Sequence, residues 1–320
     1  PLGISNISIP LSSFNGIDPD LVSTGSIDID RDRNVIWLSV LAFGVKGQLF
    51  KFDLATKIFT PYELPDNLES PVGIAIDKKG NPWITDHGTS IFFMVNSTNG
   101  KISEFSTSPL SRISANIPKD FSYTLPYWIR IDLKGNLWFN EHIGNKIAKF
   151  NPTNGTLVEY WIPTQNSLWA PCTLNESSCG ISNTLQFSIG KNNQLWFSEW
   201  TENKLGMLNS SKPLSFVVDS NAKEFNIKRG ETIEIPLVVS ANQQVDLKMI
   251  ASSTFTNTGN FGNSSFSFSQ DSFSMGPGET KNVTFLLTPS ADLENREYTL
   301  MIGGENNEMS YLNSIKVHVS

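Results

Sequence analysis

Three acidic residues each stand three positions after a tryptophan, and two of them are followed directly by a histidine. The acids are Asp86, Glu141 and Glu199, and the histidines are His87 and His142. Repeated carboxylates and imidazoles could ligate a divalent metal ion or exchange protons with a substrate. The same carboxylates could instead accept hydrogen bonds from the backbone of adjoining loops. Because successive side chains on a regular strand point to opposite faces, we expect each acid and its histidine to face different sides.

The segment that carries these acids is repeated along the chain. Aligned on tryptophan, four copies span residues 27–65, 73–105, 128–163 and 187–218. The anchor residues, 46, 55 and 58 positions apart, are Trp37, Trp83, Trp138 and Trp196. Each copy reads as four short strands: an inner strand of alternating apolar residues, the tryptophan strand, a third strand and a last strand such as "LVEYWIP". Turns such as "DLKGN" and "TNG" separate the strands and offer glycine or asparagine for positive φ.

Four-stranded units at this period predict an all-β fold with a β-propeller, in which the tryptophans pack blade against blade. We recognise four blades, and they could form part of a larger ring. Residues 4–16 resemble the last strand of a blade. We expect this segment either to close the ring by pairing with the final blade or to belong to an earlier blade.

The pattern changes near residue 213, where tryptophan disappears and short alternating strands take over. Seven or eight such strands over about a hundred residues predict a β-sandwich. The last expected strand is "SIKVHVS", whose His318 is expected to be structural. We therefore divide the chain into propeller blades at residues 1–212 and a sandwich at residues 213–320. The sandwich resembles the immunoglobulin-like modules of microbial surface proteins and glycan-active enzymes.

One rim of the propeller should gather the candidate site. Each inner strand starts there, each tryptophan strand ends there, and both long links between blades, residues 106–125 and 163–183, lie there. Loops on a rigid scaffold commonly carry function. The aromatic residues expected on this rim, next to the motif acids, are Tyr127, Trp128, Trp169 and Trp200. Such rings contact partner proteins or sugars, or they pin down their own loops; both interpretations stay open.

Composition and charge narrow the classes of partner. The net charge is −7 and no basic patch stands out, so we expect no nucleic acid partner. No run of eighteen apolar residues is present, so we expect no transmembrane segment in this chain. Cys172 and Cys179 lie close together in a polar segment, which favours a local disulfide over a metal site.

The abundance of Asn, Ser and Thr favours an extracellular or cell-surface protein of an archaeon or bacterium. The first residue is proline, so we expect the N-terminus to have been processed or trimmed. Asn-x-Ser/Thr sequons are no more frequent than chance predicts from this composition. The seven candidates for glycosylation are Asn6, Asn96, Asn154, Asn175, Asn209, Asn263 and Asn282.

The blade motif "LWFNEHIGNKIAKFNPTNGTLVEYWIP" resembles that of the streptogramin B lyase (virginiamycin B lyase) family of propellers. The resemblance covers residues 22–212, and it is specific for the blade rather than for an activity. It implies an enzyme that opens a cyclic depsipeptide by elimination at an ester, with a metal ion and a histidine that transfers protons. In that family a histidine precedes the motif acid by fourteen residues.

This chain departs from the family at those positions. Fourteen residues before its three motif acids stand Val72, Tyr127 and Leu185, and the first copy has Val40 in place of the acid. Valine and leucine carry no titratable proton, and an ordinary tyrosine titrates near 10. The visible blades therefore lack the histidine that the resemblance would require for catalysis.

We accordingly expect a non-catalytic, exported cell-envelope protein without a cofactor. Its loop-rich face would bind a partner protein or a glycan, with the sandwich as a spacer or docking module. One alternative is a metal-dependent lyase on a complete ring, whose divalent metal would be held among Asp86, Glu141, Glu199, His87 and His142. A second alternative is an accessory subunit of a larger membrane or surface-layer assembly.

Overall fold

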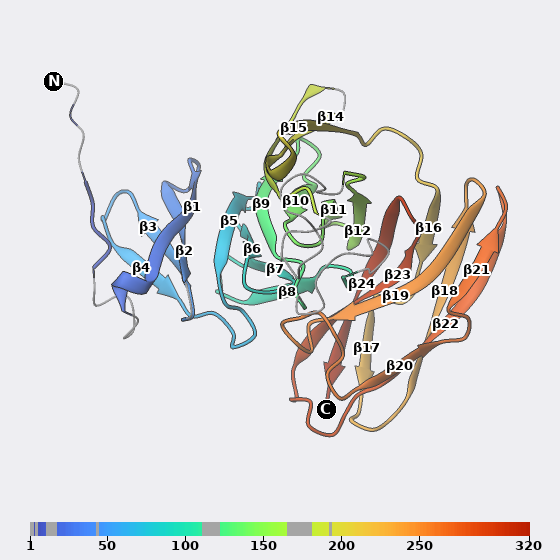
Figure 1. The fold of residues 1–320 in the computed structure, drawn as a ribbon. Helices are drawn as coiled ribbons and strands as arrows, with labels where there is room; N and C mark the ends of the chain where they lie inside the picture. Colours follow the sequence, from blue (N-terminus) through green and yellow to red (C-terminus); the bar gives the residue numbers. More distant parts are fainter. Residues whose placement is uncertain are drawn as a thin grey trace, which may run out of the picture.

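The structure is a computed structural model that describes residues 3, 6–10, 18–42, 45–110, 122–164, 181–191 and 194–320. Antiparallel strands dominate this part of the chain, which confirms the all-β prediction (Figure 1). Its short helical segments are 3-10 turns at Pro19–Leu21 and Trp200–Glu202. No helix among the described residues is long and apolar enough to cross a membrane.

Four sheets follow one another as blades, each hydrogen-bonded in chain order. Blade 1 holds β1 (Val22–Asp30), β2 (Val35–Ala42), β3 (Gln48–Asp53) and β4 (Phe59–Tyr62). Blade 2 holds β5 (Pro71–Ile76), β6 (Pro82–Asp86), β7 (Ile91–Val95) and β8 (Ile102–Ser106). Blade 3 holds β9 (Pro126–Ile131), β10 (Leu137–Glu141), β11 (Lys146–Asn151) and β12 (Thr156–Trp161). Blade 4 holds β13 (Thr184–Ile189), β14 (Gln194–Glu199) and β15 (Lys204–Asn209).

Blade 4 therefore has three strands in the described part of the chain, whereas the repeat predicted four. The segment "LSFVV" ends the fourth copy of the repeat and also begins the sandwich predicted from residue 213. It contributes β16 (Phe216–Asp219), which pairs with the sandwich. The prediction of a fourth strand in blade 4 was wrong for this segment, because an apolar alternating strand can join either sheet equally well. Which sheet it joins depends on tertiary packing.

In blades 2 and 3, the turn before the motif tryptophan explains why the repeat folds locally. In blade 3, Asp132 accepts backbone N–H bonds from Lys134 and Asn136, both at 2.9 Å. Its second carboxylate oxygen accepts the indole N–H of Trp138 at 3.0 Å. Gly135 adopts φ +85°, a conformation that costs glycine little. The turn thus connects two strands and orients the tryptophan at the same time.

The anchor tryptophans of the first three blades each pack on the next blade. Trp37 clusters with Ile74, Trp83 with Ile129, and Trp138 with Phe187. Each of these three indoles is less than 5 % exposed. Burying an aromatic side chain is worth about 1.5–3 kcal/mol, so the three contacts are a main source of blade-to-blade stability.

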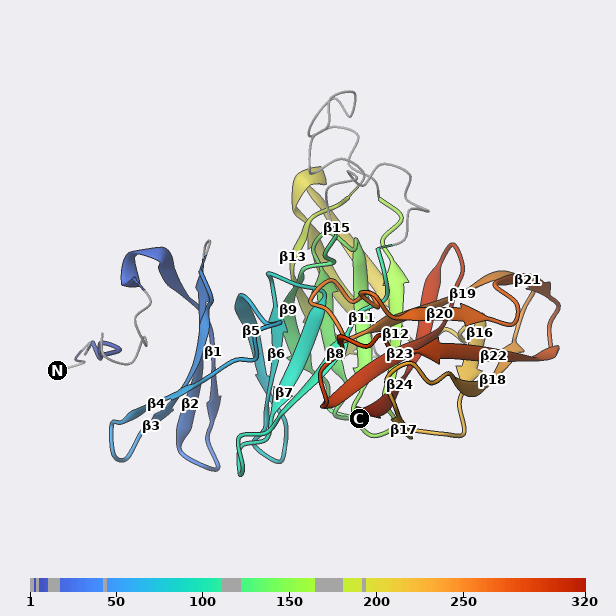
Figure 2. The same cartoon turned by 90° about the horizontal axis from the view of Figure 1, so that it is seen from below.

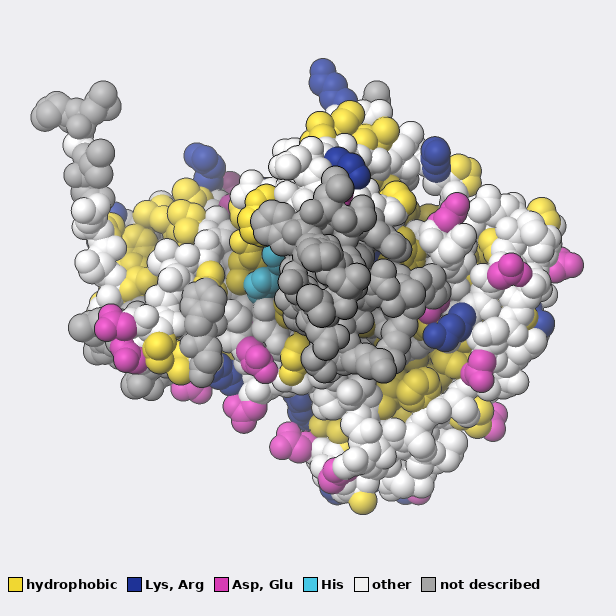
Figure 3. Space-filling view, in the orientation of Figure 1, with side chains coloured by type: hydrophobic (Ala, Val, Ile, Leu, Met, Phe, Trp, Pro, Cys, Tyr) yellow, Lys and Arg dark blue, Asp and Glu magenta, His cyan; other side chains and the backbone are white. Residues whose placement is uncertain are grey.

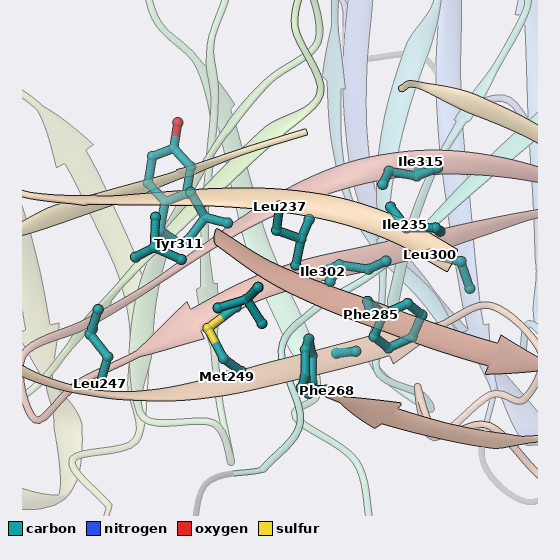
Figure 4. Close-up of a cluster of buried hydrophobic side chains, with 14 of the residues drawn as sticks. Ile235, Leu237, Leu247, Met249, Phe268, Phe285, Leu300, Ile302, Tyr311 and Ile315 are labelled. Carbon is teal, nitrogen blue, oxygen red and sulfur yellow. The ribbon is translucent and has the colours of Figure 1, made fainter. Parts of the chain in front are cut away.

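The C-terminal region forms the expected β-sandwich. One sheet holds β16, β18 (Ile233–Ala241), β22 (Thr280–Thr288) and β20 (Ser265–Phe268). The other holds β21 (Ser272–Met275), β19 (Val245–Ser253), β23 (Glu297–Glu305), β24 (Met309–Val319) and the parallel strand β17 (Glu224–Ile227). Leu237 and Phe285 of the first sheet face Met249 and Ile302 of the second in the shared core (Figure 4).

The sandwich and blade 3 share one continuous sheet. The first half of β24 pairs with β12, with Leu157 opposite Leu312 and Glu159 opposite Ser310. Both views show the sandwich strands running on from the blade (Figures 1 and 2). Met301 of β23 also packs in the core between blades 2 and 3. Backbone hydrogen bonds and a common core therefore hold the sandwich against the blades.

Candidate functional site

All four inner strands have a register irregularity near their start, at the rim where the motif acids lie. The shifts fall at Thr24/Ile27, Pro71/Ile74, Pro126/Ile129 and Thr184/Phe187. Such bulges bend a strand and redirect its side chains, and they are common at the rims of β structures next to functional sites.

A cleft of about 700 Å3 opens at this rim between blades 1, 2 and 3. The surface of its lining is mainly apolar. The lining includes Leu41, Leu68, Val72, His87, Tyr127 and His142, together with the charged residues Lys46, Asp66 and Glu69. Histidine side chains reach the surface on the face that Figure 3 shows. Open, largely apolar concavities with a few polar groups are typical of ligand sites.

Two histidines and a tyrosine form one wall of the cleft. His142 Nδ1 lies 3.4 Å from His87 Nε2, so one imidazole donates a hydrogen bond to the other. The Tyr127 ring stacks on His142 with centroids 5.2 Å apart and meets His87 edge-on at 4.8 Å. Nε2 of His142 is buried and has no hydrogen-bond partner among the described residues. The wall thus combines aromatic faces with an unused polar atom.

Burial lowers the pKa of both imidazoles to about 4. For His142 the neighbouring His87 adds to the shift, because two positive charges at this distance would repel. For His87 the Leu125 backbone opposes it. Both rings are therefore neutral at neutral pH, and each offers one N–H donor and one acceptor nitrogen.

Asp86, the acid beside His87, is buried and lies outside the cleft lining. It accepts backbone N–H bonds from Glu69 at 2.6 Å, Ser70 at 2.7 Å and Gly88 at 2.9 Å. These contacts fasten the link between blades 1 and 2 to the end of β6. Burial raises the pKa of Asp86 to about 6, although the three N–H donors oppose the shift.

Glu141, the acid beside His142, is also buried but belongs to a different environment. Its Oε2 lies 3.3 Å from Lys146 Nζ, and Glu159 Oε2 lies 3.2 Å from the same atom. All three side chains are fully buried. Ser310 of β24 donates to Glu159 at 2.5 Å, and the Ser108 backbone N–H donates to its other oxygen at 2.8 Å.

The pKa values of the two carboxyls in this cluster are shifted in opposite directions. Burial and the charge of Glu159 raise the pKa of Glu141 well above its usual value. Burial opposes ionisation of Glu159 as well, but Lys146 and the two serines lower its pKa. Burial likewise disfavours the charge on Lys146, yet the two glutamates raise its pKa. The cluster is thus a buried structural group in which Glu159 favours the charged form and Glu141 favours the protonated form.

The remaining predicted site residues are dispersed. Trp128 packs between blades 3 and 4 under the guanidinium of Arg130, whose Cζ lies 4.2 Å from the ring centroid. Glu199 is buried in blade 4, and Trp200 is 53 % exposed. Trp169, Cys172, Cys179 and the sequon at Asn175 lie outside the described residues, so the expected disulfide is not described either.

The proposed metal ligands are not gathered into one site. Within the described ranges, no three His, Cys, Asp or Glu side chains are arranged to hold a metal ion. The oxygens of Asp86 already accept three backbone N–H groups, and Glu141 lies beside Lys146. These residues therefore do not fit the ion that the family resemblance implies.

Several side chains of the rim were not predicted as site residues. Of these, Glu159 gave a signal, since it is the one charged residue within the otherwise largely apolar segment "TLVEYW". The Leu41 and Leu68 walls of the cleft gave no signal, because Leu41 lies in β2 and Leu68 in the link between blades 1 and 2, and both reach the cleft only when the blades pack.

Comparison with known proteins gave matches among solved structures. No protein-family model matches the chain, and no curated protein matches its sequence. A virginiamycin B lyase structure from Staphylococcus aureus is 15 % identical, covering 92 % of this chain and 82 % of its own, with TM-score 0.43. A streptogramin B lyase structure is 17 % identical, covering 93 % and 80 %, with TM-score 0.43. A gluconolactonase-like protein is 11 % identical, covering 94 % and 91 %, with TM-score 0.40. The chain is thus similar to propellers of the lyase type, while its own blades carry the fold assignment.

Proposed function

We propose that this protein is a non-catalytic binding module of the cell envelope. Its cleft between blades 1, 2 and 3 would receive an uncharged group with an apolar face, presented by a glycan or by a partner protein. The observation that carries this proposal is the wall of two neutral imidazoles and a tyrosine in a largely apolar concavity.

The chemistry of this wall suits recognition. Aromatic faces stack on sugar rings or aromatic side chains at little cost in conformational entropy. Neutral imidazoles supply donors and acceptors for hydroxyl or amide groups without having to desolvate a charge.

The same features argue against proton transfer as the main role. A general base works best with a pKa near the working pH, and both histidines titrate near 4. The carboxylate of Asp86 is engaged by backbone N–H groups, and Glu141 is buried beside Lys146. Tyr127, at the position where the family has histidine, stacks on His142 within the cleft.

Binding can be measured by titrating the chain with hexose and N-acetylhexosamine oligosaccharides, and separately with extracts of envelope proteins. We expect saturable binding that weakens about tenfold in Tyr127→Ala and His142→Phe. The matched control is His318→Phe, which alters a histidine of β24 outside the cleft.

Two results would count against the proposal. One is binding that is unaffected by both cleft variants. The other is opening of a cyclic depsipeptide by the wild-type chain with loss of that activity in His142→Phe, which would favour the lyase alternative.

A further inference from the structure

The three interfaces between successive blades share a two-part design on the tryptophan side. Besides the tryptophan, the residue two positions later bonds to the next blade: Ser39 Oγ donates to the Val72 carbonyl at 2.6 Å. Thr85 donates likewise to the Tyr127 carbonyl, and Asn140 donates to the Thr184 carbonyl. Each blade thus offers an indole and a polar donor to its successor.

The receiving side of each interface is equally regular. An apolar residue of the inner strand, three positions after the start of the bulge, lies under the preceding tryptophan. In blades 2, 3 and 4 these residues are Ile74, Ile129 and Phe187, exposed by 1 %, 1 % and 5 %. Burial of this position is therefore the rule wherever a preceding blade is present.

Blade 4 presents the tryptophan side with no successor among the described residues. Trp196 is 42 % exposed, against 0–4 % for the other three anchors. Leu205 and Met207 lie on the same face by register and are 69 % and 47 % exposed. Ser198, the equivalent of Ser39, bonds back to Gln186 of its own blade at 3.4 Å.

Blade 1 presents the receiving side with no predecessor in the described part. Ile27, the equivalent of Ile74, is 58 % exposed, and Ile29 beside it is 43 % exposed. The inner half of this face is thus bare. Ile9 covers its outer half, where it packs against Val40 and Phe50.

The number of strands in blade 4 also suggests that the exposed faces of blades 4 and 1 fit each other. Blade 4 has three described strands and lacks an outer one, whereas residues 6–10, which resemble an outer strand, lie against blade 1. A blade 4 seated on the inner half of blade 1 would meet residues 6–10 at the edge of β15. That is where a fourth strand would pair.

We propose that a second copy of this chain docks head to tail, with the Trp196 face of one copy on the Ile27 face of the other. The contact continues the interface that already joins blades 1 to 2, 2 to 3 and 3 to 4. Within one chain the two faces do not meet, because blades 2 and 3 stand between blades 1 and 4 (Figures 1 and 2). Two such contacts related by a two-fold axis close a dimer.

The test is the mass of the full chain in solution, measured by sedimentation from about 1 to 100 μM, the range of typical weak to moderate self-association. We expect a concentration-dependent shift from 35.5 kDa to twice that value. Trp196→Asp and Ile27→Asp should each weaken association by about 30-fold or more. Leu133→Asp is the matched control, because Leu133 is 96 % exposed in a turn away from both faces.

Mixing the two variants tests the head-to-tail geometry. Trp196→Asp keeps an intact receiving face and Ile27→Asp keeps an intact tryptophan face, so the equimolar mixture should form a dimer through one contact. Circular dichroism and the urea midpoint show whether each variant folds. A wild-type chain that remains at 35.5 kDa throughout, or dimers that both variants leave intact, would overturn the proposal.

Discussion

The motif acids of blades 2 and 3 occupy equivalent positions, yet the two blades use them differently. Asp86 ties down a loop through three backbone N–H bonds. Glu141 lies in a buried cluster with Lys146 and Glu159. The cause is the partner strand: five residues after the acid, blade 3 has Lys146 where blade 2 has Ile91. Blade 3 also receives Ser310 from the sandwich.

This difference shows that a repeated motif specifies a position in the blade and leaves the chemistry of its polar residues to their neighbours. Asp86 is short and surrounded by backbone donors, so it acts as a loop cap. Glu141 reaches the buried ammonium group of Lys146, and Glu159 lies beside the same group. Both roles are structural, and each leaves the adjacent histidine free to face the cleft.

Lys146→Met should lower the free energy of unfolding more than any other substitution that we propose. The change leaves Glu159 buried without its cation, and we expect a loss of about 3–5 kcal/mol in the free energy of unfolding. Lys204→Met is the control, because Lys204 occupies the equivalent position in blade 4 and is 53 % exposed. Urea denaturation measures both, and similar losses for the two variants would contradict the assignment of a buried cluster.

The pH dependence of stability should distinguish Asp86 from the cluster. Its folded pKa of about 6 lies above its unfolded value near 3.8, so the folded state binds the extra proton between them. Its contribution is full below about pH 4 and is lost as the pH rises through 6, by at most about 3 kcal/mol. Asp86→Asn should remove this dependence. Urea curves from pH 4 to 7 that match those of the wild type would refute the raised pKa.

Glu159→Gln and Glu141→Gln should separate the ionised carboxyl from the protonated one. The first removes the anion that pairs with Lys146 and should cost about 2 kcal/mol, since Glu141 can ionise in its place. The second replaces a neutral carboxyl by a neutral amide and should cost less than about 1 kcal/mol. Thermal or urea unfolding at pH 7 compares them, and the reverse order would exchange the two roles.

The histidine pair should show a pH dependence of stability with the opposite sign to that of Asp86. A folded pKa of about 4, below the unfolded 6.5, means that the unfolded chain binds more protons between these values. The contribution is full above pH 6.5 and is lost as the pH falls through 4, by about 1–2 kcal/mol for a half-buried ring. His142→Gln should flatten the pH dependence of the free energy of unfolding in this window. Urea curves from pH 4 to 7 measure it, and a variant that keeps the wild-type slope would contradict the lowered pKa.

The repeat was predictable because a propeller blade is a local unit. Each blade's strands are joined by short turns, and Asp132 with Trp138 closes such a turn within six residues. Residue type and spacing were therefore enough to predict the blades, the β-sandwich and the rim on which the acids lie. The same local logic placed each acid and its histidine on different faces.

The fate of "LSFVV", the pairing of β24 with β12 and the shape of the cleft could not be predicted in this way. Each depends on contacts between segments far apart in the chain, such as Glu159 with Ser310 across 151 positions. The sequence of an alternating apolar strand does not specify which sheet the strand will join, because the backbone hydrogen bonds are the same in every sheet.

Local periodicity and turn chemistry were thus enough to specify strands, blades and the side of the ring on which polar residues gather. Only the packed structure decided that His87, His142 and Tyr127 form one wall while Asp86 and Glu141 turn away from it. The physical reason is that side-chain partners and burial, which determine protonation and availability, arise from the meeting of distant segments.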